Sequence, residues 1–298
     1  MNYRDYLNTK NIIKLCEKIN IPQEVIQQVT EIIRTGEANK AEPYFAGLFD
    51  PETAPDSSKA IDELFSSDDE VSPAKTFGYM TVLLTAALKL YEIYEEKGID
   101  LDIYYDTMSL FRTVLDRDMA FYGEYSFRDT AFWYYRMFAC LLYKLGTLEY
   151  EMKYADENFA KIFSLSEGDP LLSVHIPFKA VLTRELLDES YKKARSFFTK
   201  YYPQFTNAPI TCGTWLLSPE LKAFLPENSK ILEFQSDYKI VSTDKSNDNC
   251  LFFLFGNPKK PVDHTSLPEN TSLRRAAKQH LINGGVIGTG TGIYNDRE

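Results

Sequence analysis

The sequence has 298 residues, 44% of them hydrophobic and 26% charged, and carries a formal net charge of −10. This length is enough for two domains, and the composition is typical of a soluble globular protein. The acidic balance argues against a nucleic-acid partner, because binding to a phosphate backbone requires a basic surface.

The N-terminus and the cysteines indicate a cytoplasmic protein. The first ten residues, MNYRDYLNTK, lack the apolar stretch of a secretory signal. The longest apolar runs, such as residues 80–90, are interrupted and too short to span a bilayer. The four cysteines are scattered and form no CxxC pair, which is typical of free thiols in a reducing compartment. We therefore predict a cytoplasmic location and no membrane partner.

The first half of the chain has a helical pattern. Residues 3–35 predict two helices, the second opened by Pro22. Residues 36–72 are polar and predict a long connection with one short helix near Glu63. Its acidic run, Asp68–Glu70, is expected to be a solvated surface rather than a metal site.

Three longer helices are predicted next, at Pro73–Lys97, Asp100–Asp116 and Phe127–Leu145. The third is nearly apolar all round and is therefore expected to be buried. Its aromatic cluster, Phe132–Tyr135, favours core packing over a ligand cage. We predict an all-helical N-terminal domain at residues 1–145.

After Gly146 the spacing of apolar residues changes from helical to alternating. Residues 147–155 predict a half-buried antiparallel strand, and residues 159–165 a second one. A third strand is predicted at residues 171–176, where Leu172, Val174 and Ile176 share one face while Leu171, Ser173 and His175 share the other. Pro177 ends the pairing because it has no N–H to donate.

A loop, residues 178–182, joins this third strand to a predicted helix with Thr183 as its N-cap. The apolar stripe of that helix is Leu186, Leu187, Tyr191, Ala194, Phe197 and Phe198. Unpaired N–H groups and the positive end of the helix dipole meet at such a junction, so an anion could bind there. An ordinary connection without a ligand explains the spacing about equally well.

The rest of the chain predicts further strands and helices. Strands are expected at Ile210–Leu217, Ser229–Ser242, Cys250–Phe255 and Val286–Tyr294, with a short helix opened by Pro219 and a longer one at 273–282. The predicted fold class is α+β, with the helical domain packed on a mixed β-sheet domain with flanking helices at residues 146–298.

Several segments of the second half carry a resemblance to a known family: KLGTLEYEM at 144–152, LLSVHIP at 171–177, TCGTWLLSPEL at 211–221, SKILEFQ at 229–235, TSLRRAAKQHLINGG at 271–285 and GTGTGI at 288–293. The order of elements from residue 147 resembles the GNAT (N-acyltransferase) fold. The whole chain resembles bacterial acyltransferase-domain proteins, which join a helical N-terminal half to a GNAT-like C-terminal half. The resemblance implies acyl-CoA as co-substrate and transfer of its acyl group, by direct attack, to a small-molecule or peptide amine.

The predicted coenzyme loop departs from this family. Typical GNAT enzymes hold the CoA pyrophosphate with backbone N–H groups of a glycine-rich loop, whereas residues 177–183 here contain no glycine. Side chains hinder close backbone approach to a pyrophosphate, which argues against the usual mode of binding. Lys179 could supply charge and Thr183 a hydroxyl, beside Ile176 and Pro177. The alternative is a non-catalytic GNAT-fold module whose helical half binds a ligand or a protein.

Acyl transfer to an amine requires a base, an acid for the leaving thiolate and donors for the oxyanion. His175 is the best candidate base, although a structural histidine is equally compatible with the sequence. Glu149 and Glu151 share a strand face and could act through water, or could be solvated edge residues. Tyr238 is a candidate acid.

Three further residues are candidates for binding the co-substrate. Trp215 could line the acyl or acceptor pocket, or belong to the core. Arg274 and Arg275, in the first turn of the last predicted helix, could hold a phosphate or carboxylate, or lie on the surface. His264 and His280 lack the spacing of metal ligands, so no metal is predicted. The run GTGTG at 288–292 has no following helix and is not a dinucleotide fingerprint.

Overall fold

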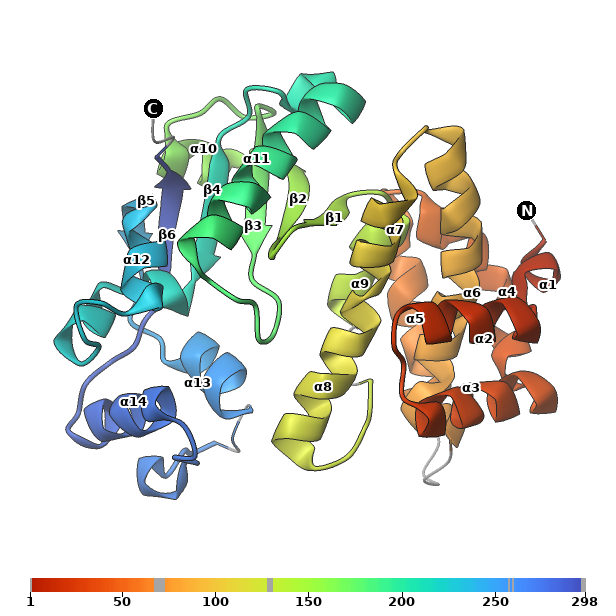
Figure 1. Ribbon diagram of the computed structural model, residues 1–298, viewed down its shortest axis with the longest axis horizontal. Helices are drawn as coiled ribbons and strands as arrows, with labels where there is room; N and C mark the ends of the chain where they lie inside the picture. Colours follow the sequence, from red (N-terminus) through yellow and green to blue (C-terminus); the bar gives the residue numbers. More distant parts are fainter. Residues whose placement is uncertain (1, 67–72, 128–130, 257, 259, 296–298) are drawn as a thin grey trace. The chain divides into compact units, whose positions relative to one another are not determined.

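The computed structural model describes residues 2–66, 73–127, 131–256, 258 and 260–295. The chain divides into two compact units, Met1–Leu145 and Gly146–Glu298. The first unit is coloured red to yellow in Figure 1 and the second green to blue.

The first unit is helical. Its helices are α1 (Tyr3–Tyr6), α2 (Thr9–Lys18), α3 (Gln23–Thr35), α4 (Glu42–Phe45), α5 (Ala54–Ser66), α6 (Pro73–Glu96), α7 (Leu101–Met108), α8 (Leu110–Tyr122) and α9 (Ala131–Phe138), with 3-10 turns η1 (Glu37–Ala41) and η2 (Ala46–Phe49). The unit ends in a short strand, β1 (Leu142–Leu145).

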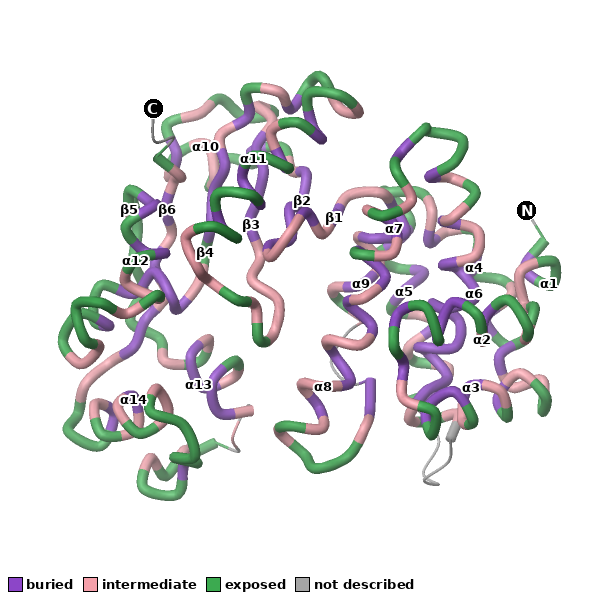
Figure 2. The backbone as a smooth tube through the Cα atoms, viewed as in Figure 1, coloured by how far each residue is buried: buried purple, intermediate pink, exposed green. Residues whose placement is uncertain are grey.

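Helix α6 forms the centre of this unit. Every residue from 77 to 87 is buried, as the purple segment of Figure 2 shows. Thr81 and Thr85 can be buried there because their hydroxyls donate to the carbonyls of Phe77 and Thr81, at 2.8 and 2.9 Å. The predicted helix at Pro73–Lys97 is confirmed.

Other predictions in this unit need correction. The predicted helix Asp100–Asp116 is two helices, α7 and α8, separated at Ser109. The predicted helix Phe127–Leu145 is wrong beyond Phe138, because Cys140 adopts a positive φ of 55° and the chain continues as β1. The connection predicted at 36–72 contains α4 and α5, and the acidic run Asp68–Glu70 lies outside the described residues.

Among its described residues, the second unit contains five strands and their flanking helices. The strands are β2 (Leu148–Tyr154), β3 (Pro170–His175), β4 (Ile210–Thr214), β5 (Tyr238–Thr243) and β6 (Gly290–Tyr294). The helices are α10 (Glu157–Phe163), α11 (Arg184–Tyr201), α12 (Lys230–Ser236), α13 (Asp248–Phe255) and α14 (Ser272–Ile282), with 3-10 turns η3 (Pro203–Phe205), η4 (Trp215–Leu217), η5 (Pro219–Ala223) and η6 (His264–Ser266).

The sheet is mixed, with strand order β1-β2-β3-β4-β6-β5. β3 and β4 are parallel, while β2 pairs with β3, β4 with β6 and β5 with β6 in antiparallel fashion. The predicted α+β class, a helical region followed by a mixed sheet with flanking helices, is confirmed.

Three segments predicted as strands are helical instead. Residues 159–165 overlap α10, which Asp156 caps by accepting a hydrogen bond from the Phe159 N–H at 2.8 Å. The segment Cys250–Phe255 lies in α13, and the first half of Ser229–Ser242 forms α12 before β5 begins. Short apolar runs fit a buried strand and a buried helix equally well, which explains these errors.

Helix α11 packs on one face of the sheet. Its apolar side includes Tyr191 and Phe198, whose rings lie 4.1 Å from Tyr294 and 6.5 Å from Tyr150. Figure 1 shows α11 in front of the sheet. The face that carries Tyr150 and Tyr294 is therefore a closed, aromatic core.

The glycines of β6 allow close backbone contacts. A Cβ atom at Gly290 would overlap the carbonyl of Leu217, and one at Gly292 would lie 3.0 Å from the Cβ of Tyr238. The glycine-rich run at 288–292 therefore serves packing between β6, β5 and η4.

Candidate functional site

The β2–β3 pair brings three of the four candidate catalytic residues onto one face of the sheet. Glu149 is the direct partner of His175, and Glu151 the partner of Ser173. Directly opposed residues of an antiparallel pair share a face, as do residues two apart on one strand. His175, Glu149 and Glu151 therefore project together, on the face opposite Tyr150.

His175 and Glu151 form a close polar pair. The distance from His175 Nε2 to Glu151 Oε2 is 2.9 Å, and Lys153 Nζ lies 3.5 Å from the same oxygen. Glu151 is only 4% exposed, whereas the imidazole side chain of His175 is 23% exposed. A buried carboxylate that orients a reachable imidazole is the arrangement that activates a general base.

The pair lies where the parallel strands stop pairing. The last paired residues of β3 and β4 are Val174 and Cys212, so His175 and Gly213 are the first residues beyond them. A Cβ atom at Gly213 would contact only Thr291 Oγ1, at 3.7 Å. Beside His175, β4 therefore has a glycine with space next to its backbone, and no side chain fills that position.

The loop after β3 makes a tight turn without glycine. The Ala180 N–H donates to the Pro177 carbonyl at 3.0 Å, and Lys179 has a φ of 61°, a left-handed conformation that glycine usually takes. The Thr147 hydroxyl fastens the loop further by donating to the Val181 carbonyl at 2.9 Å. Lys179 is exposed, and Ile176 and Pro177 are half-buried.

Thr183 occupies the N-cap position of α11, as predicted. Its side chain makes no capping hydrogen bond, so it satisfies none of the N–H groups in the first helical turn. This end of an 18-residue helix thus keeps the donors and the positive dipole that suit an anion.

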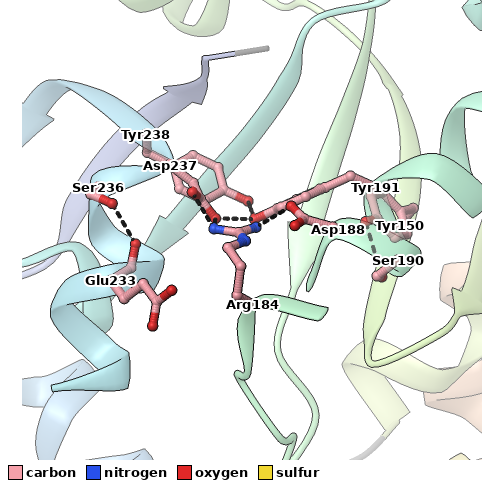
Figure 3. Close-up of polar contacts among 9 residues, drawn as sticks. All are labelled: Tyr150, Arg184, Asp188, Ser190, Tyr191, Glu233, Ser236, Asp237 and Tyr238. Carbon is pink, nitrogen blue, oxygen red and sulfur yellow. Dashed lines mark hydrogen bonds and ion pairs between the residues drawn. The ribbon is translucent and has the colours of Figure 1, made fainter. Parts of the chain in front are cut away.

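The sequence reasoning missed an ion pair at the start of α11, drawn in Figure 3. Arg184 Nη1 lies 2.7 and 2.9 Å from the two carboxylate oxygens of Asp237, and Nη2 lies 2.7 Å from Asp188 Oδ1. The Asp237 side chain has no exposed surface. Burial opposes the charged guanidinium, but its bonds to both carboxylates outweigh that effect and raise the pKa of Arg184.

Tyr238 belongs to the same network and not to the His175 pair. The Tyr191 hydroxyl oxygen lies 3.3 Å from Asp237 Oδ2 and 3.3 Å from the Tyr238 hydroxyl oxygen. The Tyr191 hydroxyl is the donor in both contacts, so its one hydrogen is shared between the Asp237 carboxylate and the Tyr238 hydroxyl oxygen. Burial raises the pKa of Tyr191 and of Tyr238.

The remaining candidates are spread over the unit. Trp215 is buried in η4, directly after β4, and its backbone N–H donates to Asn249 Oδ1 at 3.4 Å. Arg274 donates from Nε to the Leu254 carbonyl at 2.8 Å, and Arg275 donates to the Glu269 carbonyl at 3.0 Å. The two arginines thus hold the segment between α13 and α14. Burial lowers the pKa of Arg274.

Within the described ranges, no group of three or more His, Cys, Asp or Glu side chains is placed to hold a metal ion. No helix among those residues is both long and apolar enough to cross a bilayer.

The fold is similar to that of solved acyltransferases. A crystal structure of an acyltransferase with decanoyl-CoA and teicoplanin matches with a TM-score of 0.78 and 19% identity, covering 96% of this chain and 87% of that chain. One with CoA and 10C-teicoplanin has a TM-score of 0.76 and 19% identity, covering 95% and 86%. One with decanoyl-CoA has a TM-score of 0.74 and 20% identity, covering 96% and 87%.

Sequence comparison points the same way. No curated protein matches this chain significantly. Residues 10–140 match the N-acyltransferase N-terminal domain, and residues 142–294, just over half of the chain, match the GNAT-like C-terminal domain. The protein therefore belongs to the GNAT-like C-terminal domain family, with an N-acyltransferase N-terminal domain preceding that domain.

Proposed function

We propose that the protein transfers an acyl group from acyl-CoA to an amine by direct attack of the amine on the thioester. The observation that carries this proposal is the His175–Glu151 pair beside the end of the β3–β4 pairing. The family assignment supports acyl transfer, and the solved acyltransferases of similar fold hold decanoyl-CoA or CoA.

In this reaction His175 accepts a proton from the acceptor ammonium, and Glu151 holds the imidazole in place and stabilises its charged form. The amine nitrogen then bonds to the thioester carbonyl carbon, the carbon–sulfur bond breaks, and the CoA thiolate takes up a proton while the nitrogen loses its second one. The products are an amide and free CoA. Glu149, the other buried carboxylate on this face, is the second candidate for orienting the proton acceptor.

The first turn of α11 and the side chain of Lys179 would receive the phosphates of acyl-CoA. The helix offers N–H donors without a side-chain cap, and Lys179 offers an exposed cation in the preceding loop. The loop has no glycine, but Lys179 supplies a left-handed turn residue in its place. Ile176, Pro177 and Trp215 flank the two strand ends and would contact the pantetheine or the acyl group.

The acceptor is proposed to be an amine of a larger molecule. Two of the solved acyltransferases of similar fold contain teicoplanin or 10C-teicoplanin beside the coenzyme. An amine on a glycopeptide is therefore the first acceptor to test, followed by simple amines and peptide amines.

The test is an acyl-transfer assay with purified protein. Acetyl-CoA, octanoyl-CoA, decanoyl-CoA and palmitoyl-CoA are each mixed with teicoplanin or with a panel of simple amines. Free thiol is measured together with the mass of the acylated product. The proposal expects amine-dependent release of CoA and a matching amide. A folded sample that neither binds any of these thioesters in calorimetry nor releases CoA contradicts it.

The glycine-free loop favours one other function, a GNAT-fold module that binds a ligand or protein without catalysis. Side chains at residues 177–183 restrict how closely a pyrophosphate can approach the backbone. A folded sample that binds no acyl-CoA in calorimetry would favour that function over transfer.

A further inference from the structure

Arg184 begins α11 at a place where the helix itself does not favour a cation. The first turn of a helix is the positive end of its dipole, so acidic side chains are the stabilising choice there. The Arg184 guanidinium is nevertheless held between Asp188, one turn further along the helix, and the buried Asp237. The interaction that favours an arginine at this position is therefore the one with Asp237, outside the helix.

Asp237 is itself fixed at the junction of α12 and β5. Its N–H donates to the Phe234 carbonyl at 3.1 Å, and its carbonyl accepts from the Asn295 N–H at 2.8 Å. Both oxygens of its carboxylate lie within 2.9 Å of Arg184 Nη1. The pair thus connects the first residue of α11 to the β5–β6 edge of the sheet, as Figure 3 shows.

A second contact fixes the same helix further along. Tyr191 lies two turns after Arg184, its hydroxyl bonds to Asp237, and its ring lies 4.1 Å from Tyr294. One buried carboxylate therefore binds α11 at two points on its sheet-facing side. This restricts both the tilt and the rotation of the helix end.

We propose that Arg184 and Asp237 are positioning residues, which hold the first turn of α11 and the preceding loop in the orientation that receives the phosphates of acyl-CoA. This inference rests on the proposed function. A loop without glycine has less freedom to fold its backbone around a pyrophosphate, so the direction of the N–H donors must be set by the helix. Small errors in the placement of binding groups lower binding affinity and rate. A buried pair that fixes the helix end would prevent such errors.

A purely electrostatic role would behave differently. Arg184→Gln removes a cation and Asp237→Asn removes an anion, so through charge alone the two variants would shift affinity for a phosphate ligand in opposite directions. Through positioning, both variants shift it in the same direction, because either one breaks the same contact.

The experiment compares two thioesters, decanoyl-CoA and decanoyl-pantetheine, which carry the same acyl group with and without the nucleotide phosphates. For Arg184→Gln and for Asp237→Asn we expect KM for decanoyl-CoA to rise on the order of tenfold, with kcat retained. KM for decanoyl-pantetheine should change less than about twofold, and the double variant should be no worse than either single one. Opposite shifts, or equal losses with both thioesters, overturn the inference.

Asp188→Asn is the matched control. Asp188 also pairs with Arg184, at 2.7 Å, but its side chain is 58% exposed and the pair lies within α11. KM for decanoyl-CoA should stay within about twofold of the wild type. An Asp188→Asn effect as large as that of Asp237→Asn would assign the role to the local helix pair.

Hydrogen exchange separates this inference from the proposed function. Amides of α11 from Leu187 to Tyr191 should exchange faster in Arg184→Gln and Asp237→Asn but not in Asp188→Asn, whether or not the protein is active. Wild-type protein that neither binds nor turns over any of the four acyl-CoAs contradicts the proposed function alone. Unchanged exchange, or active variants with wild-type KM, contradicts the positioning role. Arg184→Lys keeps the positive charge but loses the planar guanidinium that bonds to both carboxylates. It replaces the other variants in the KM and exchange measurements if they fail to fold.

Discussion

His175 and Tyr238 project from opposite faces of one sheet. The face of His175 can be followed across the sheet through the paired residues Ser173, Thr211, Ile293 and Lys239. Tyr238 precedes Lys239 on β5 and therefore points to the other side, under α11. The base and the acid predicted from the sequence thus lie in separate environments: an accessible polar pair and a closed aromatic core.

Replacing the candidate base is the most direct prediction. His175→Ala should lower kcat on the order of 10²-fold, because the acceptor ammonium then loses its proton only to water. The measurement is steady-state kinetics with decanoyl-CoA and the best acceptor of the panel. His264→Ala, which changes a histidine in η6, is the control and should match the wild type. An unchanged kcat for His175→Ala removes His175 from the role of base.

The two members of the pair should act as one unit. Glu151→Gln should lower kcat about tenfold, since an amide orients the ring less firmly and does not stabilise its charged form. In a protein that already carries His175→Ala, Glu151→Gln should not lower kcat further. Glu149→Gln serves as the comparison, because Glu149 is equally buried and lies on the same face. A larger loss of kcat from Glu149→Gln than from Glu151→Gln would show that Glu149, not Glu151, orients the His175 imidazole.

The elements around this pair could be predicted because their patterns are unambiguous. The sequence of β2 alternates apolar and polar residues in strict period two, and β3 ends at His175, two residues before Pro177. α11 carries an apolar stripe behind a good N-cap residue. These features predict the two strands that carry His175, Glu149 and Glu151, but not their pairing, because residues 159–165 are predicted as a strand between them and form α10 instead.

What could not be predicted depends on contacts between distant residues. Arg184 and Asp237 are 53 positions apart, and nothing in the sequence pairs them. The available signal was the arginine itself, directly after an N-cap, where the helix dipole disfavours a cation. The side of the sheet on which Tyr238 lies was also hidden, because the segment before it was predicted as strand and forms α12.

The glycines of the sheet should differ in their tolerance of a methyl group. Gly290→Ala should lower the free energy of unfolding by about 1–3 kcal/mol, because the new Cβ would overlap the Leu217 carbonyl and the backbone must shift. Gly213→Ala should have little effect on stability, since its Cβ would meet only Thr291 Oγ1, at 3.7 Å. Urea denaturation of both variants measures this difference. Equal losses would show that the space beside His175 is not free.

The buried tyrosine network should make the protein sensitive to high pH. Burial raises the pKa of Tyr191 and Tyr238 above the ordinary value of 10.0, so the folded state holds these protons more tightly than the unfolded state. Their contribution to stability is therefore complete below about pH 10 and is lost as pH rises further, at up to about 1.4 kcal/mol per pH unit for each tyrosine. Urea denaturation from about pH 9 to about pH 11 measures the slope. Tyr238→Phe should make this slope shallower by about one proton. Equal slopes for Tyr238→Phe and the wild type would show that Tyr238 ionises as readily in the folded protein as in the unfolded chain, which would contradict this prediction.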